Sequence, residues 1–171
     1  MNYQVLKLAK TEFESMSGLF DTLEEKGVIE SPSSSIKLRD ILRMDVAQYL
    51  MYLSAADGRI DANEVTVFQV VTGYGDNASD IVESIKNNNI YSTAFESTVP
   101  ISLKIAVEAE YKLLRVTGET REVTLPELFV SMFERIGSVL VEADGGVTYN
   151  ERRDLNIYLD TLRGYMHDRG F

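Results

Sequence analysis

At residues 53–64 the chain reads LSAADGRIDANE, and at residues 140–151 it reads LVEADGGVTYNE. The two stretches share an Ala-Asp-Gly triplet, an aliphatic residue two positions after the glycine and a glutamate six positions after it. Matching spacing at several chemically special positions, with helical patterns on both sides, indicates a duplicated helix–turn–helix unit. We therefore expect an all-α bundle with two pseudo-symmetric helical-hairpin halves.

Each copy of the repeat carries the signals that end one helix and begin the next. Gly58 and Gly145 can take the left-handed conformation that stops a helix. Asp61 stands three residues before Glu64, which is the spacing of a capping box, and the helix restarts in the second copy at Thr148. These signals predict an antiparallel helical hairpin around each turn.

Apolar residues at helical spacing extend this pattern along most of the chain. We predict about seven helices, with no competing strand pattern. The first helix spans about 9–23, with Ala9, Phe13, Met16, Leu19, Phe20 and Leu23 on one face, and a Ser/Pro linker follows at 31–35. The other predicted stripes run through 38–53, 65–71, 81–85 (capped by Asn77), 100–116, 125–140 and 155–166, with a connection at 91–99. The predicted organisation is one compact unit, in which an N-terminal helix within residues 1–30 packs on a helical domain formed by residues 36–171.

Composition excludes several classes of function. The 171 residues include 27 acidic and 17 basic side chains, for a net charge of -10, and no cysteine. The absence of a basic cluster argues against a nucleic-acid partner, and the absence of cysteine excludes disulfides and thiolate zinc sites. Charged residues such as Lys7 and Glu12 interrupt the first 15 residues, and no later stretch could span a bilayer. We therefore expect a cytoplasmic protein without direct membrane insertion.

The acidic residues of the repeat have two possible explanations. Capping accounts for the glycines and for the glutamates, but an aspartate at the negative end of a helix dipole is mildly unfavourable, so Asp57 and Asp144 need another reason. Oxygen ligands suit Ca²⁺, Mg²⁺ or Mn²⁺. The candidate metal ligands are Asp57, Glu64, Asp144 and Glu151, with Asp61 and Glu142 as further candidates that each occur in one repeat only.

An ordinary EF-hand does not fit these positions. Placing Glu64 at the twelfth position of the calcium loop puts Leu53 at the first, and the second copy puts Leu140 there. Both leucines continue the apolar stripes of the helices that precede the turns. A calcium loop would require those helices to unwind where they pack.

The sequence offers little catalytic chemistry. His167 is the only histidine, so it has no imidazole partner, and we expect it on the surface. The chain contains no Gly-x-Ser-x-Gly elbow, dinucleotide fingerprint or P-loop. Glu134 is not followed three residues later by histidine, as di-iron bundles require. We predict no catalytic residues, no organic cofactor and no enzymatic activity.

The Ala-Asp-Gly-x-Ile-Asp-x-x-Glu turn between two amphipathic helices, present in a second copy, resembles the TerB-like domain of tellurite-resistance proteins. The resemblance covers roughly residues 38–166, so residues 36–171 are the predicted TerB-like domain. It implies an all-helical fold of two similar halves with acidic metal-binding residues. Asp57 and Glu64 match the motif acids of the first half, and Asp144 and Glu151 match those of the second.

The second copy departs from the motif, because Gly146 and Thr148 stand where the first copy has Arg59 and Asp61. The two halves therefore differ in one candidate ligand.

Three functional hypotheses follow. In the first, the chain is a non-enzymatic TerB-like accessory module in stress response or signalling that binds a protein partner, with a divalent cation as an additional ligand. In the second, it is an acidic immunity or anti-defence protein that neutralises a basic partner by charge complementarity, without metal. In the third, the chain is a metal-dependent hydrolase. An exposed subset of the nine tyrosines could supply a partner surface.

Overall fold

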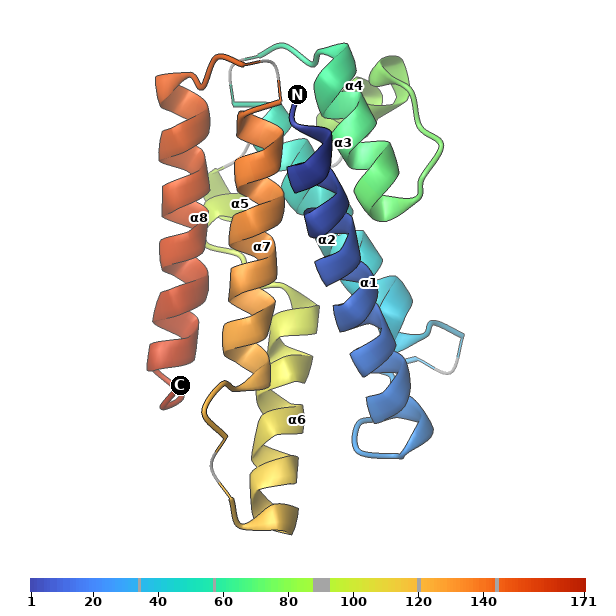
Figure 1. The fold of residues 1–171 in the computed structure, drawn as a ribbon, viewed down its shortest axis with the longest axis vertical. Coiled ribbons are helices and arrows are strands. Elements are labelled where there is room, and N and C mark those ends of the chain that lie inside the picture. The colour runs from blue at the N-terminus through green and yellow to red at the C-terminus, as the bar shows by residue number, and fades with distance from the viewer. Residues whose placement is uncertain (34, 57, 88–92, 120, 144) are drawn as a thin grey trace.

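The chain folds into a bundle of helices, shown in Figure 1. This computed structural model describes residues 1–33, 35–56, 58–87, 93–119, 121–143 and 145–171, and these contain no strand. The helical segments are α1 (Tyr3–Glu25), α2 (Leu38–Ser54), α3 (Ala62–Thr72), α4 (Ala78–Asn87), α5 (Thr93–Glu96), α6 (Ile101–Thr117), α7 (Leu125–Val141) and α8 (Tyr149–His167). Seven of them have ten residues or more, and α5 is a single turn. The prediction of an all-α bundle of about seven helices is therefore confirmed.

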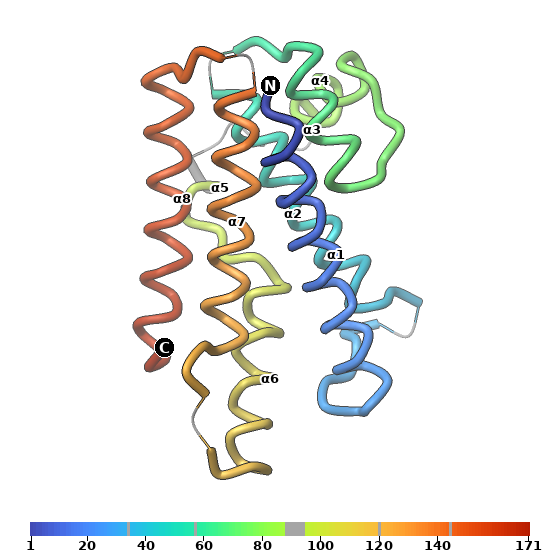
Figure 2. Tube along the Cα trace, in the orientation of Figure 1, coloured from blue at the N-terminus to red at the C-terminus, as the bar shows by residue number. Residues whose placement is uncertain are grey.

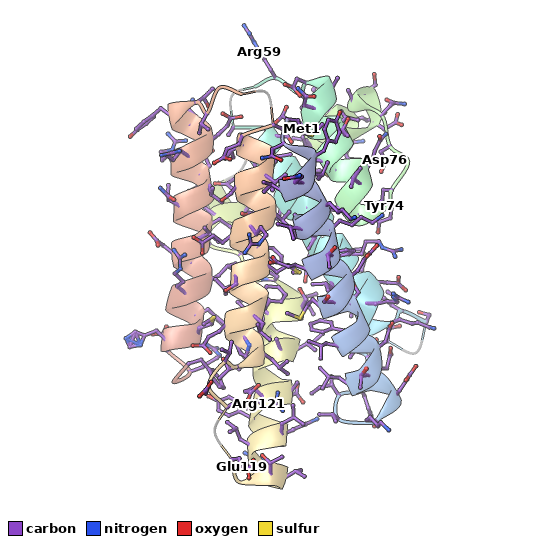
Figure 3. The ribbon with its side chains drawn as sticks, viewed as in Figure 1. Met1, Arg59, Tyr74, Asp76, Glu119 and Arg121 are labelled. Atoms are coloured by element: carbon purple, nitrogen blue, oxygen red, sulfur yellow. The ribbon has the colours of Figure 1, made fainter. Side chains whose placement is uncertain are left out.

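Two antiparallel hairpins organise the bundle. Helices α2 and α7 run toward the same end of the molecule, and α3 and α8 return from it (Figure 2). The start of α1 also lies at this end, which we call the turn end and define by the described residues of 55–61 and 142–148. Figure 3 labels Arg59 at the turn end and Glu119 and Arg121, from the α6–α7 loop, at the opposite end.

Helix α1 is part of the core rather than an outlying arm. It contacts α2, α3 and α7, and its buried face begins at Leu6. The helix starts earlier than predicted because the Asn2 side chain accepts hydrogen bonds from the backbone N–H groups of Gln4 and Val5, at 3.1 and 3.4 Å. Residue 2 therefore supplies a helix start that the apolar stripe alone did not reveal.

Most residues of the predicted apolar stripes are buried in one continuous core, while Val65 and Val82 are half-buried. Leu19 on α1 and Leu128 on α7, which belong to the predicted apolar stripes at 9–23 and 125–140, are exposed. Together with Met16 they line the same shallow groove between the two helices. The stripes do not predict burial correctly at these two positions because each residue lies at the edge of its helix's buried face, where the neighbouring helix does not cover it.

An aromatic cluster fills the centre of the bundle. The ring of Tyr158 on α8 lies 5.0 Å from that of Tyr49 on α2 and 5.3 Å from that of Phe95 on α5. The fully buried Tyr49 hydroxyl donates to the Phe133 carbonyl oxygen of α7 at 3.1 Å. Buried tyrosine hydroxyls need such partners, and this bond ties the first hairpin to the second.

Two helices are capped by acidic side chains from other parts of the chain. Asp45 on α2 accepts hydrogen bonds from the backbone N–H of Ser102, at 2.8 Å, and from its hydroxyl, at 2.5 Å, at the start of α6. Glu110 on α6, fully buried, accepts from the N–H of Leu125 at the start of α7, at 2.9 Å. Carboxylates are favourable at these positions because helix N-termini carry partial positive charge and unsatisfied donors.

The predicted connection at 91–99 contains the short helix α5, which the sequence did not indicate. None of the helices in the described part of the chain combines the length and the apolar character needed to cross a lipid bilayer.

Candidate functional site

The first turn is held together by a complete capping box. Gly58 takes the left-handed conformation, with φ of 77°. The Asp61 carboxylate then accepts hydrogen bonds from the N–H groups of Asn63 and Glu64, at 2.6 and 2.8 Å. In return the Glu64 Oε2 atom accepts from the Asp61 N–H at 2.8 Å. The predicted helix start is confirmed, and both acids take part in it.

The second turn repeats this arrangement with a different capping residue. Gly145 is left-handed, with φ of 87°, and Thr148 begins α8. The Thr148 hydroxyl accepts from the Glu151 N–H at 3.2 Å, and Glu151 Oε2 accepts from the Thr148 N–H at 2.7 Å. The hydroxyl of Thr148 thus replaces the carboxylate of Asp61, so the geometry of the repeat is preserved while one negative charge is lost.

The aliphatic residue that follows each glycine differs between the copies. Ile60 is half-buried and packs on the core, whereas Val147 is exposed. The aliphatic residue of the repeat is therefore packed on the core in the first copy only. Leu53 and Leu140 are both buried on intact helices, in agreement with the argument against EF-hand loops.

The candidate metal ligands fall into three groups. Asp57 and Asp144 lie outside the described residues. Glu64 and Glu151 are buried, and each uses Oε2 to hold the N–H of its own capping residue. Asp61 caps α3, while Glu142 is exposed at the end of α7. Among the residues that the structure describes, no three acidic, histidine or cysteine side chains are grouped as a metal site would need.

The turn end exposes two tyrosines that the sequence could not distinguish from core residues. Tyr3, at the start of α1, is 71% exposed, and Tyr149, at the start of α8, is 80% exposed. By contrast, Tyr49, Tyr52 and Tyr158 are buried. Tyrosine combines contact area with a polar group and is enriched in protein interfaces, so its exposure at this end is relevant to binding.

The predicted surface position of the single histidine is confirmed, since His167 is exposed at the last turn of α8. It lies at the end of α8 away from the turn end (Figure 1). His167 and the acids of the two turns are therefore separated by the length of α8.

Comparison of the chain with protein-family models, with curated proteins and with solved structures gives no match. The likeness to TerB-like domains therefore stays a prediction from the repeated turn.

Proposed function

We propose that this chain is a non-enzymatic, TerB-like accessory module in stress response or signalling, which binds a protein partner and a divalent cation at its turn end. The observation that carries the proposal is the position of the two repeated turns at the same end of the bundle (Figure 1). Had the turns been at opposite ends, their acids could not act together.

Binding of a protein partner is supported by the side chains around the turns. Tyr3 and Tyr149 are large amphipathic residues, and most of their surface is in contact with solvent. Partner binding commonly depends on a few aromatic anchors surrounded by polar groups. Two exposed tyrosines beside acidic turns suit a partner with a basic rim.

The cation test uses the aspartates rather than the glutamates. Replacing Glu64 or Glu151 would remove a capping hydrogen bond and destabilise the fold with or without metal. The informative variants are Asp57→Asn and Asp144→Asn, alone and combined, because asparagine keeps the size and turn preference of aspartate but loses its charge. Asp160→Asn, on the exposed face of α8, is the matched control.

Thermal unfolding with Ca²⁺, Mg²⁺ or Mn²⁺ is the assay. A cation at 100 times its dissociation constant stabilises the folded state by about 2.7 kcal/mol, which raises the melting temperature of a chain of this size by about 5–10 °C. We expect that shift in the wild type and the Asp160→Asn control, and its loss in the double variant. An unchanged melting temperature at millimolar concentrations of all three metals would remove cation binding from the proposal.

Partner binding is tested by capture on immobilised protein across a salt series. Tyr149→Ser should reduce capture of a specific partner, whereas Val116→Ser, at an 84% exposed position on α6, should leave it unchanged. If capture is lost at high salt but is unchanged by Tyr149→Ser and by metal, the acidic immunity or anti-defence hypothesis is favoured instead. The net charge of -10 is the observation that supports that hypothesis.

A further inference from the structure

A second candidate site lies on the side of the bundle formed by α1, α2 and α3. A cavity of about 310 Å³ opens between these helices. Lys10, Arg39 and Arg43 line it, together with one acid, Glu14, the buried Phe13 and the last residues of α3. Tyr74, which follows α3 on this side, is labelled in Figure 3. The volume is at the lower end of the range for small-molecule pockets.

Three cations around one cavity are unexpected in this chain, which has 17 basic side chains against 27 acidic ones. Arg39 and Arg43 are one helical turn apart on α2, so their charges repel each other along the helix face. An anion between them would turn that repulsion into attraction. The cavity is therefore a place where this acidic protein could accept a negatively charged ligand.

The hydrogen bonding of the arginines is incomplete. The Nε atoms of Arg39 and Arg43 are both buried and have no hydrogen-bond partner among the residues that the structure describes. A buried donor without a partner is unfavourable, and an arginine fork binds the oxygen atoms of phosphates and carboxylates with two parallel hydrogen bonds. Two arginines beside one cavity supply the type of donor that a phosphate group binds.

Each of the three cations has an acidic neighbour, and Lys10 pairs with Glu14 at 3.6 Å. Arg39 pairs with Asp21 at 3.1 Å and Arg43 with Asp40 at 3.8 Å. The Arg43 guanidinium also lies 5.9 Å from the centre of the Tyr74 ring. These contacts restrict the long side chains before any ligand arrives, which lowers the entropy lost on binding.

The end of α3 limits where an anion can be seated. The carbonyl end of a helix carries partial negative charge, and α3 ends at this cavity with Gly73 as its C-cap. An anion is therefore favoured on the α2 side, against the arginines, while the neutral part of a ligand can occupy the α3 side beside Gln69. This division suits a phosphate attached to a small polar or apolar group.

We propose that the cavity between α1, α2 and α3 binds the phosphate group of a small phosphorylated molecule through Arg39 and Arg43, with Lys10 as a third positive charge. The site is separate from the acids of the turn end, and the inference does not depend on the function proposed there. The chemistry recognised is a phosphate dianion, whether it is free or part of a monoester.

Calorimetric titration of the full chain at constant ionic strength is the test, with inorganic phosphate and phosphoserine as the two probes and chloride as the background anion. Arg39→Gln and Arg43→Gln should each weaken binding by at least about tenfold, the loss expected for one charge-assisted contact. Arg43→Lys keeps the charge without the fork and should weaken binding less than Arg43→Gln does. Arg163→Gln is the control, because its side chain is 48% exposed, similar to the 42% of Arg39, and pairs with Glu134 on another face.

The two probes separate the possible sources of the ligand. Tighter binding of phosphoserine than of phosphate would identify a phosphorylated small molecule, and equal binding would identify the free ion. Failure of both probes to bind above the chloride background would overturn the proposal. Equal weakening by Arg163→Gln and Arg43→Gln would also overturn it, because attraction would then be a property of total charge. Circular dichroism spectra of each variant establish that a lost signal does not come from unfolding.

Discussion

The two hairpins pack tightly at Gly137, in the C-terminal half of α7. A Cβ atom added there would lie 2.1 Å from the Tyr49 hydroxyl oxygen and 2.6 Å from the Leu155 Cδ1 atom. Both distances are far below van der Waals contact. We predict that Gly137→Ala destabilises the protein, although alanine normally favours a helix over glycine by about 1 kcal/mol.

The size of the effect follows from three contributions. Overpacking a core costs about 1–3 kcal/mol, and displacing the Tyr49 hydroxyl from the Phe133 carbonyl oxygen leaves a buried donor unpaired, at about 1–3 kcal/mol. The helix preference of alanine offsets about 1 kcal/mol of this. A net loss of about 3 kcal/mol is expected, which corresponds to a fall of about 6–12 °C in melting temperature for a chain of this length.

Urea unfolding of Gly137→Ala provides the measurement, with Gly164→Ala as the control. Gly164 is on α8 and has open space where its Cβ would be, so alanine should be neutral or slightly stabilising there. Adding Tyr49→Phe to Gly137→Ala removes the closest clash and should recover part of the loss, giving a favourable coupling energy in the double-mutant cycle. Equal stability of Gly137→Ala and Gly164→Ala would refute the close approach of α2 and α7.

Three further predictions concern polar side chains. Burial raises the pKa of Asp45 above its ordinary 3.8, so the folded protein binds this proton more tightly than the unfolded chain does. The resulting contribution to the free energy of unfolding is complete below pH 3.8 and is lost as the pH rises through the raised pKa. Relative to wild type in urea unfolding, Asp45→Asn should therefore gain stability with increasing pH across that range. Burial likewise raises the pKa of Tyr49, Tyr52 and Tyr158, and spectrophotometric titration should show these three ionising only when the protein unfolds in alkali. Thr148→Ala, which removes the cap of α8, should cost about 1 kcal/mol in urea unfolding, and an unchanged midpoint would contradict the capping role.

The sequence predicts the helices well because their signals are local. Apolar residues at intervals of three and four place the buried face of each long helix, and the Asp61 and Thr148 caps fix where α3 and α8 begin. Leu19 and Leu128 show the limit of this reasoning. Each has the right spacing, but burial also depends on how far the neighbouring helix extends over it, which a single stripe does not specify.

Contacts between distant segments could not be predicted in the same way. Asp45 and Ser102 are 57 positions apart, and nothing in either local sequence identifies the other as its partner. Glu110 looks like an ordinary surface residue of an amphipathic helix until α7 is placed with its N-terminus against α6. Arg39 and Arg43 could be recognised as one helix face, but their common cavity with Lys10 exists only once α1 and α3 are packed around them.

The capping boxes also change how the repeated acids should be interpreted. Both glutamates of the repeat, Glu64 and Glu151, are buried and bonded to backbone N–H groups, so their presence in two copies is explained by folding alone. A cation that required their Oε2 atoms would have to break the starts of α3 and α8. The caps of α3 and α8 are Asp61 and Thr148, so helix capping does not explain why the sequence repeats an aspartate at positions 57 and 144. The functional question at the turn end therefore rests on the two aspartates. If Asp57→Asn and Asp144→Asn together leave the metal-induced shift in melting temperature and the capture of a partner unchanged, the repeated turns serve only to connect the helices of each hairpin.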